Sequence, residues 1–196
     1  AAFQSAKPEA AKVNAEKDLA DEIKELKRSV IFDKAQVVRR ESDLRIMIKH
    51  QGGCHCGQIR FTTEYDPMLV MQCNCLSCRK ISGSMTVSAM FAEHEIEMTG
   101  QCKEYTYMGG SGMPFHRGFC ENCGQYVYGK PTAFEGFMVM TLGSFDDPHQ
   151  FEPKMEIFTD KKLKWLKDDG CIKNSFEESA TEERIQAMME NMEQRG

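Results

Sequence analysis

Seven of the nine cysteines in this 196-residue chain stand in short, closely spaced groups, and these groups limit how the chain can fold. The groups are Cys54-His55-Cys56, Cys73-Asn74-Cys75 with Cys78, and Cys120-Glu121-Asn122-Cys123. Cysteines two residues apart make poor disulfide partners, but they can converge on one metal ion. The odd cysteine count and the lack of a visible secretory signal also argue against a disulfide-stapled secreted protein. We therefore predict metal-binding thiolates in a reducing, intracellular environment.

The spacing divides the seven thiols into two unequal sets. Tetrahedral zinc needs sulfurs about 3.8 Å apart, and a pair separated by one residue reaches this only where the backbone bends. Gly53 and Gly57 flank the first pair and Gly124 follows the last pair, so both segments can bend. Two such pairs from distant parts of the chain predict a closed, structural zinc site. Its four ligands are Cys54, Cys56, Cys120 and Cys123.

Cys73, Cys75 and Cys78 remain, and they lack an evident fourth partner. Three cysteines with one free position are typical of a reactive zinc that takes water or a substrate thiol. Arg79 and Lys80 add positive charge beside these thiols, which favours an anionic ligand.

Three alternatives to a reactive zinc stay open for Cys73, Cys75 and Cys78. They could bind no metal, or an iron–sulfur cluster, although their spacing matches the usual ferredoxin runs poorly. They could also form a second structural site with one more ligand, the candidates being His55, His116, Cys102 and Cys171.

The hydrophobic pattern divides the chain into three predicted regions. Residues 1–41 contain no Cys or Gly, and apolar residues recur there at helical spacing from Val13 to Val30. This pattern predicts an amphipathic helix that packs on its own domain or docks on a protein partner. Residues 171–196 are predicted to form a partly helical tail. In that tail Ser179 and Glu182 match a capping box, and an apolar row follows at Ile185, Met188, Met189 and Met192.

Residues 42–170 change to a period of two, which predicts a mainly β domain of antiparallel sheets. Leu44–Lys49 is predicted as a strand leading into Gly52-Gly53, and Cys78–Gly83 as a helical turn. Eight further strands are expected at Gln58–Glu64, Met68–Gln72, Met85–Phe91, Ile96–Thr99, Cys102–Tyr107, Phe115–Phe119, Gln125–Tyr128 and Gly136–Leu142.

The net charge of −5 and the absence of a long apolar run narrow the partners. They predict no nucleic-acid binding and no membrane span. The chain begins with Ala1, which is compatible with removal of an organellar presequence. We expect the protein in the cytosol or in an organelle matrix or stroma.

Several of these motifs together resemble the glutathione-dependent formaldehyde-activating enzyme family, which also contains centromere protein V. The matching stretches are 52–61, 73–84, Ser111-Gly112 with Arg117, 119–124, 145–148, 157–159 and Trp165. The resemblance implies an antiparallel β-tent zinc fold. It also implies that Cys54, Cys56, Cys120 and Cys123 are structural and that Cys73, Cys75 and Cys78 are catalytic. The chain departs from the family pattern at Gln125, where a small hydroxyl residue is usual.

The resemblance further implies a reaction and its ligands. Glutathione and formaldehyde combine to S-hydroxymethylglutathione, which is a carbon–sulfur lyase reaction run in reverse. Candidates for holding the glutathione carboxylates are Arg79, Lys80 and Arg117. We therefore expect a zinc-dependent carbon–sulfur lyase-type enzyme that acts on adducts of glutathione or a related small thiol.

A second hypothesis comes from a different class of protein. The two terminal helices and the start at Ala1 are also compatible with a zinc-stabilised accessory subunit of a larger complex, for example in an organelle. In that case the N-terminal helix is the expected docking element. Centromere-type binding is disfavoured, because the chain is acidic and has no basic tail.

Overall fold

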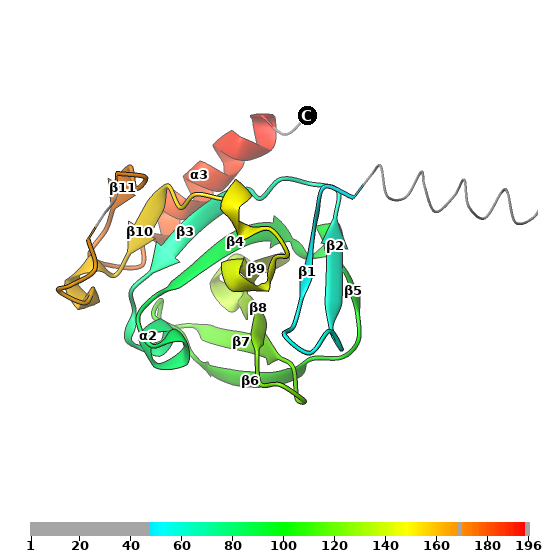
Figure 1. The fold of residues 1–196 in the computed structure, drawn as a ribbon. Helices are drawn as coiled ribbons and strands as arrows, with labels where there is room; N and C mark the ends of the chain where they lie inside the picture. The colour runs from blue at the N-terminus through cyan, green and yellow to red at the C-terminus, as the bar shows by residue number, and fades with distance from the viewer. Residues whose placement is uncertain (1–47, 168–169, 195–196) are drawn as a thin grey trace, which may run out of the picture. The chain divides into compact units, whose positions relative to one another are not determined.

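The computed structural model describes residues 48–167 and 170–194, and the strands within them form two sheets (Figure 1). The small antiparallel sheet has the order β1-β2-β5, with β1 at His50–Gly53, β2 at Arg60–Thr63 and β5 at Glu97–Thr99. The large sheet has the order β11-β10-β3-β4-β9-β8-β7-β6. Its strands are β3 (Leu69–Cys73), β4 (Thr86–Ala92), β6 (Lys103–Met108), β7 (Pro114–Phe119), β8 (Tyr126–Pro131), β9 (Phe137–Thr141), β10 (Met155–Ile157) and β11 (Asn174–Ser175).

In the described part of the chain, two α-helices and five short 3-10 helices join or cover these strands. The α-helices are α2 (Leu76–Ser82) and α3 (Thr181–Gln194). The 3-10 helices are η1 (Glu93–Glu95), η2 (Thr132–Phe134), η3 (Leu142–Ser144), η4 (Pro148–Gln150) and η5 (Thr159–Lys161). The prediction of a mainly β fold is thus confirmed.

The strands predicted between Gln58 and Leu142 are all present, with ends that differ by at most three residues. One feature was not predicted: β10 pairs in parallel with both β3 and β11. Parallel neighbours need a long connection, and β4 to β9 lie between β3 and β10 in the chain. The return of the chain therefore adds a parallel edge to an otherwise antiparallel sheet.

The centre of the large sheet is buried on both faces. In β4, Ala89 and Phe91 point to one side, while Met90 and Ala92 point to the other, as strand geometry requires. The first side packs with Phe61 of the small sheet and forms a first core. The second side forms a second core, which includes Met188 of α3. One cysteine group borders each core, so the two groups are on different sides of the sheet.

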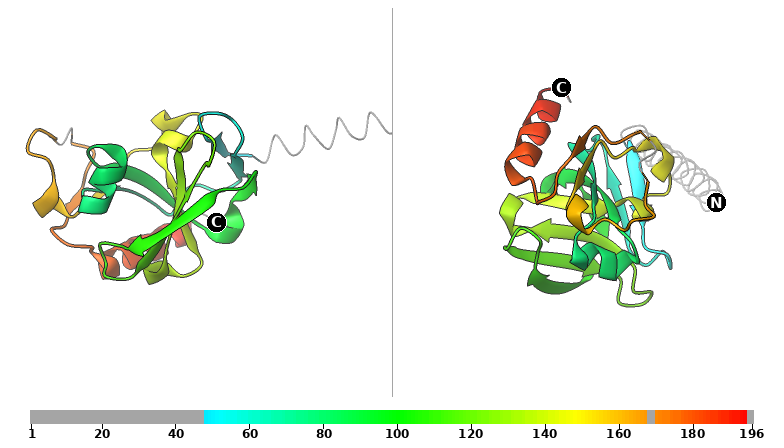
Figure 2. Two further views of the ribbon diagram at one scale, coloured as in Figure 1. Left: turned by 90° about the horizontal axis from the view of Figure 1, so that it is seen from below. Right: turned by 90° about the vertical axis from the view of Figure 1, so that its left-hand side faces the viewer.

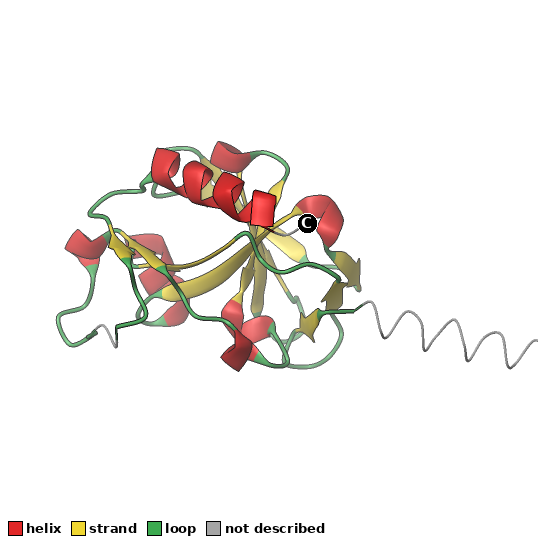
Figure 3. Cartoon of the chain, turned by 90° about the horizontal axis from the view of Figure 1, so that it is seen from above, coloured by secondary structure: helices red, strands yellow, loops and turns green. Residues whose placement is uncertain are grey.

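Helix α3 lies against the large sheet, as Figures 2 and 3 show, and its Met188 belongs to the second core. The predicted helix is present, but of its predicted apolar row only Met188 faces inward. Ile185, Met189 and Met192 are 40%, 62% and 51% exposed, whereas Arg184 and Met188 are 6% and 3% exposed. The row was misread because the buried face carries an arginine, which a hydrophobic pattern does not register.

The ends of three other predicted elements also differ. α3 begins at Thr181, so Ser179 lies before the cap position and its hydroxyl pairs with that of Thr181 instead; the predicted capping box is wrong. α2 begins at Leu76, two residues before the predicted turn, because the Cys75 side chain caps it. Ile48 and Lys49 precede β1, and the rest of the predicted strand at 44–49 lies outside the described residues.

The predicted N-terminal helix within residues 1–41 also lies outside the described residues. Within 48–167 and 170–194, no helix has both the length and the apolar character needed to cross a membrane.

Candidate metal centres

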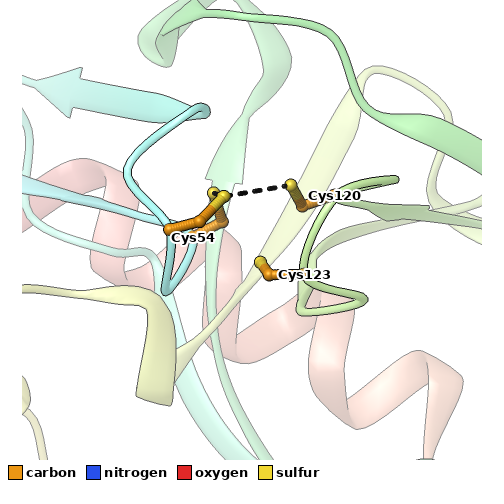
Figure 4. A group of neighbouring side chains, drawn as sticks. Cys54, Cys120 and Cys123 are labelled. Atoms are coloured by element: carbon orange, nitrogen blue, oxygen red, sulfur yellow. Dashed lines mark hydrogen bonds between the residues drawn. The ribbon is translucent and has the colours of Figure 1, made fainter.

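Cys54, Cys56, Cys120 and Cys123 come together as the spacing predicted, and we call them the four-cysteine cluster. Their sulfur atoms all lie within 4.8 Å of one another. Figure 4 shows the sulfurs of Cys54, Cys120 and Cys123 turned towards a common centre from two loops. The Sγ of Cys56 lies 3.5 Å from that of Cys54 and 3.7 Å from that of Cys120. Tetrahedral zinc requires about 3.8 Å, so these residues fit the ion.

Both loops of the four-cysteine cluster bend at a glycine in the left-handed region. Gly57 has φ 77° and its N–H bonds the Cys54 carbonyl, while Gly124 has φ 75° and its N–H bonds the Cys120 carbonyl. A side chain at these positions would strain the backbone. The N–H of Ile59 also donates to the Cys54 sulfur at 3.2 Å. The local sequence therefore sets the direction of both pairs of thiols.

Polar groups around the four-cysteine cluster favour thiolates. The pKa of Cys56 is lowered to about 6, first by a hydrogen bond from the Asn122 side chain and then by the backbone N–H of Gln58. Zinc binds the thiolate rather than the thiol, so such donors assist metal binding.

Cys73, Cys75 and Cys78 form the second group, which we call the cysteine trio. Cys73 ends β3, Cys75 caps α2 and Cys78 lies in its first turn, and their sulfurs lie within 4.8 Å of one another. Hydrogen bonds from Cys73 and then Cys78 lower the pKa of Cys75, and backbone N–H groups of α2 add to this effect. A helix N-terminus stabilises a thiolate in this way. The same coupling raises the pKa of Cys73 and of Cys78, so Cys75 is the favoured thiolate of the three, and the converging sulfurs could hold a cation.

Asn74 fixes the turn between the first two thiols of the trio. It is 1% exposed, its backbone N–H and its Nδ2 both donate to the Ile157 carbonyl at 3.1 Å, and Nδ2 also reaches Glu156 at 3.4 Å. Glu156 is buried and pairs with Lys162 at 2.8 Å. The turn is therefore anchored to β10 by a fully buried side chain.

The cysteine trio opens into a cavity of about 80 Å³ in the second core. Phenol groups of Tyr107 and Tyr126 contribute to its walls. Burial, with the negative charge of Cys78 next in weight, raises the pKa of Tyr107 and of Tyr126, so both phenols stay protonated at neutral pH. Within the described ranges, no fourth Cys, His, Asp or Glu joins the trio.

The structure bears on two alternatives for the cysteines, disulfide bonds and a fourth protein ligand at the trio. The cysteines, all of which lie in the described residues, form no disulfide, which agrees with the expectation against disulfides. None of the candidate fourth ligands joins the trio: the His55 N–H bonds Gln125, the ring of His116 pairs with Thr106, and Cys102 packs against the first core.

The three cations predicted to hold carboxylates do not line this cavity. Arg79 is half-buried and donates to the Lys161 carbonyl at 3.5 Å, and Lys80 is exposed. Arg117 lies among aromatic rings, 5.6 Å from that of Tyr105. A cation that the sequence analysis missed, Arg184 of α3, does line the cavity. Its one sequence signal is its helical spacing of four from Met188.

Comparison with protein families agrees with the cysteine motifs of the sequence. The family model described as glutathione-dependent formaldehyde-activating enzyme matches residues 49–161. A solved structure of a Rhodobacter sphaeroides protein, a Northeast Structural Genomics target, is similar over 64% of this chain and 98% of that chain. The two are 17% identical, with a TM-score of 0.39. No curated protein matches the chain significantly.

Proposed function

Because the chain belongs to the glutathione-dependent formaldehyde-activating enzyme family, we propose that it is a zinc-dependent enzyme of the carbon–sulfur lyase type. Its substrates would be adducts of a small thiol with an aldehyde. The reaction for which the family is named involves glutathione and formaldehyde. The observation that carries the proposal is the open cysteine trio. Its three sulfurs converge at a cavity where the described residues supply no fourth ligand.

The two cysteine groups would have different roles, one structural and one catalytic. The four-cysteine cluster would hold a structural zinc, because four protein thiolates leave no free position. Cys73, Cys75 and Cys78 would hold the second zinc. When bound there, zinc lowers the pKa of a thiol at the free position and keeps it as a thiolate.

The residues of the cavity supply the remaining chemistry. In the reaction, the S–H bond of the thiol breaks and its proton leaves, the sulfur forms a bond to the carbonyl carbon, the carbonyl π electrons move to the oxygen, and that oxygen takes up one proton in return. Tyr107 and Tyr126 line this cavity, and their phenols, which stay protonated, would act as hydrogen-bond donors there. Donors of this kind stabilise negative charge as it develops on the oxygen. The apolar second core around them excludes water from the adduct.

Arg79, Lys80 and Arg117 keep a smaller role in the proposal. Because they lie outside the cavity, they would hold carboxylates only on a part of glutathione that remains outside it. Arg79 is the best placed of the three, since it follows Cys78 directly in α2.

The experiment follows adduct formation by exchange NMR of glutathione with formaldehyde, with the zinc-loaded full chain. We expect exchange above the uncatalysed rate, and we expect Cys75→Ser to abolish the excess while the chain stays folded. Cys102→Ser is the matched control, because Cys102 belongs to neither group, and its rate should equal that of the wild type. A wild-type rate equal to the uncatalysed one would contradict the proposal.

One observation favours the second candidate, an accessory subunit of a larger complex. Ile185, Met189 and Met192 form an exposed apolar row on α3, and such rows often mark protein contacts. Size measurement after native extraction tests this function, because a subunit elutes with its complex. A monomer or simple dimer would contradict it.

A further inference from the structure

Arg184 brings a positive charge into the cavity of the cysteine trio from outside the segment that matches the family. It lies on α3, beyond the matched residues 49–161, and it lines the cavity together with all three thiols. Its side chain is 6% exposed. The cation is therefore part of the site and is sealed from bulk water.

The surroundings of Arg184 leave its charge without a carboxylate partner. Its Cζ lies 4.5 Å from the centre of the Phe134 ring, its Nη1 lies 4.0 Å from the Met71 sulfur, and its Nε has no hydrogen-bond partner. No Asp or Glu pairs with it within the described residues. A ring face and a thioether are weak partners for a guanidinium, which carries five N–H donors in a planar fork.

The charge nevertheless persists at neutral pH. Burial lowers the pKa of Arg184 to about 10, and the negative charge of Cys73 opposes this effect. A buried charge with no ion partner is costly, and folded proteins seldom keep one without a use. An anion that enters the cavity would supply what the fold omits, and a guanidinium fork fits a carboxylate through two parallel hydrogen bonds.

The size of the cavity limits that anion. Its volume of about 80 Å³ holds on the order of five to eight water-sized groups. This is enough for a thiol and a carboxylate joined by a short chain, but not for a whole tripeptide. The thiol end would meet the trio, and the carboxylate would meet the guanidinium.

We propose that Arg184 is a substrate-binding residue of this cavity, where its guanidinium binds the carboxylate of a thiol whose sulfur lies at the cysteine trio. The proposal rests on the proposed function, and it names the substrate class as thiol-carboxylates. A small mercapto acid carries this chemistry, whereas the carboxyl next to the thiol of glutathione is part of the peptide bond to glycine and has no charge to offer.

Binding of four probes to the full, zinc-loaded chain, measured by calorimetry, tests the proposal. The probes are 3-mercaptopropionate, 2-mercaptoethanol, propionate and glutathione. We expect 3-mercaptopropionate to bind more tightly than 2-mercaptoethanol. Arg184→Met, which keeps the length of the side chain, should weaken 3-mercaptopropionate roughly 10- to 100-fold. It should leave 2-mercaptoethanol binding and zinc content unchanged.

Three results would overturn the proposal. One is a wild type that does not prefer the carboxylate-bearing thiol. Another is an R184M chain that binds 3-mercaptopropionate as the wild type does. The last is loss of zinc from the trio in R184M, which would show that Arg184 only balances the charge of the thiolates. If R184M does not fold, Arg184→Lys decides. If Arg184→Lys weakens the binding of 3-mercaptopropionate but not that of 2-mercaptoethanol, the proposal is supported. Any other pattern overturns it.

The remaining probes separate this proposal from the enzyme function. If propionate binds as well as 3-mercaptopropionate and both depend on Arg184, the anion site stands and the thiol chemistry fails. If 2-mercaptoethanol binds but a carboxylate adds nothing, the thiol chemistry stands and the role of Arg184 fails. Glutathione has no carboxylate a short chain away from its sulfur, so its binding should be the same in the wild type and in R184M, and a dependence on Arg184 would overturn the assignment of the substrate to small mercapto acids.

Discussion

The side-chain oxygen of Gln125 accepts a hydrogen bond of 2.9 Å from the backbone N–H of His55. His55 lies between the first two thiols of the four-cysteine cluster, and Gln125 follows directly after the loop that carries the other two. The Nε2 of Gln125 donates to the Ser144 hydroxyl at 3.0 Å. One side chain therefore holds the two ligand loops and η3 together. A shorter side chain could not span them.

Gln125→Ala should therefore destabilise the protein. It removes the hydrogen bond to His55 and leaves the buried Ser144 with one partner fewer, so we expect a loss of about 1–2 kcal/mol in the free energy of unfolding. Denaturant unfolding of the zinc-loaded chain measures it. Gln101→Ala is the control, because Gln101 is exposed and lies outside both loops. Equal stabilities for the two variants would show that the hydrogen bonds of Gln125 contribute nothing to the free energy of unfolding.

The two cysteine groups should differ in what metal removal does. We expect about two zinc ions per chain by metal analysis, one for each group. Cys120→Ser opens the buried four-cysteine cluster and should unfold the chain, because structural zinc supplies folding free energy. Cys75→Ser should lose one zinc and keep the fold, and Cys102→Ser should keep both. One zinc in the wild type would count against a metal at the trio.

Asn74 lies in the cysteine trio and Asn122 in the four-cysteine cluster, so replacing each asparagine should weaken zinc binding at its own group only. Asn74→Ala removes the anchor of the trio turn to β10, so we expect zinc affinity at the trio to fall roughly 10- to 100-fold. Asn122→Ala removes the donor to Cys56 and should weaken the four-cysteine cluster instead. Competition with a chelator measures the zinc affinity of both groups. If both variants weaken the same zinc, the assignment of the asparagines is wrong.

Arg60 and Asp146 predict a pH-dependent coupling between β2 and the segment after η3. Arg60 donates to Asp146 at 2.9 Å through Nη1 and also contacts it through Nη2, and this hydrogen bonding lowers the pKa of Asp146. A carboxyl with a lowered folded-state pKa contributes stability above its unfolded pKa, near about 4, and loses it as the pH falls further.

A double-mutant cycle of Arg60→Ala and Asp146→Asn measures that coupling. Both side chains are partly exposed, so solvent screening limits the coupling energy to about 0.2–1 kcal/mol. We expect it in unfolding experiments at pH 7 and expect a smaller value at acid pH, as the carboxyl becomes protonated in the folded state as well. A coupling energy that is the same at both pH values would contradict this interpretation.

The sequence was enough to predict both thiol groups and most of the strands, because those signals are local. Ligand spacing and flanking glycines bring thiols together within a few residues, and the alternation of β4 and β9 follows from strand geometry. Gln125, Asn74 and Arg184 were missed as partners of the sites. Each acts across the fold, on residues far from it in the chain, and nothing in its neighbouring sequence identifies its partner.

Helix α3 shows how an unrecognised polar contact misleads a hydrophobic pattern. The row of Ile185, Met189 and Met192 is more apolar than the true inward face, which carries Arg184 and Asn191. Asn191 donates to the Met68 carbonyl, and Arg184 lines the trio cavity. The helix docks through these polar groups and Met188, so its buried side is set by the cavity that it closes.

Two neighbouring methionines on α3 test this orientation. Met188 is 3% exposed within the second core and Met189 is 62% exposed, although both belong to the predicted apolar row. Met188→Ala should cost about 2–5 kcal/mol of unfolding free energy, because it removes buried methylenes and leaves a cavity. Met189→Ala should change stability by less than about 0.5 kcal/mol. If Met189→Ala were the more damaging change, the exposed row would be the docked face, and Arg184 would point away from the trio.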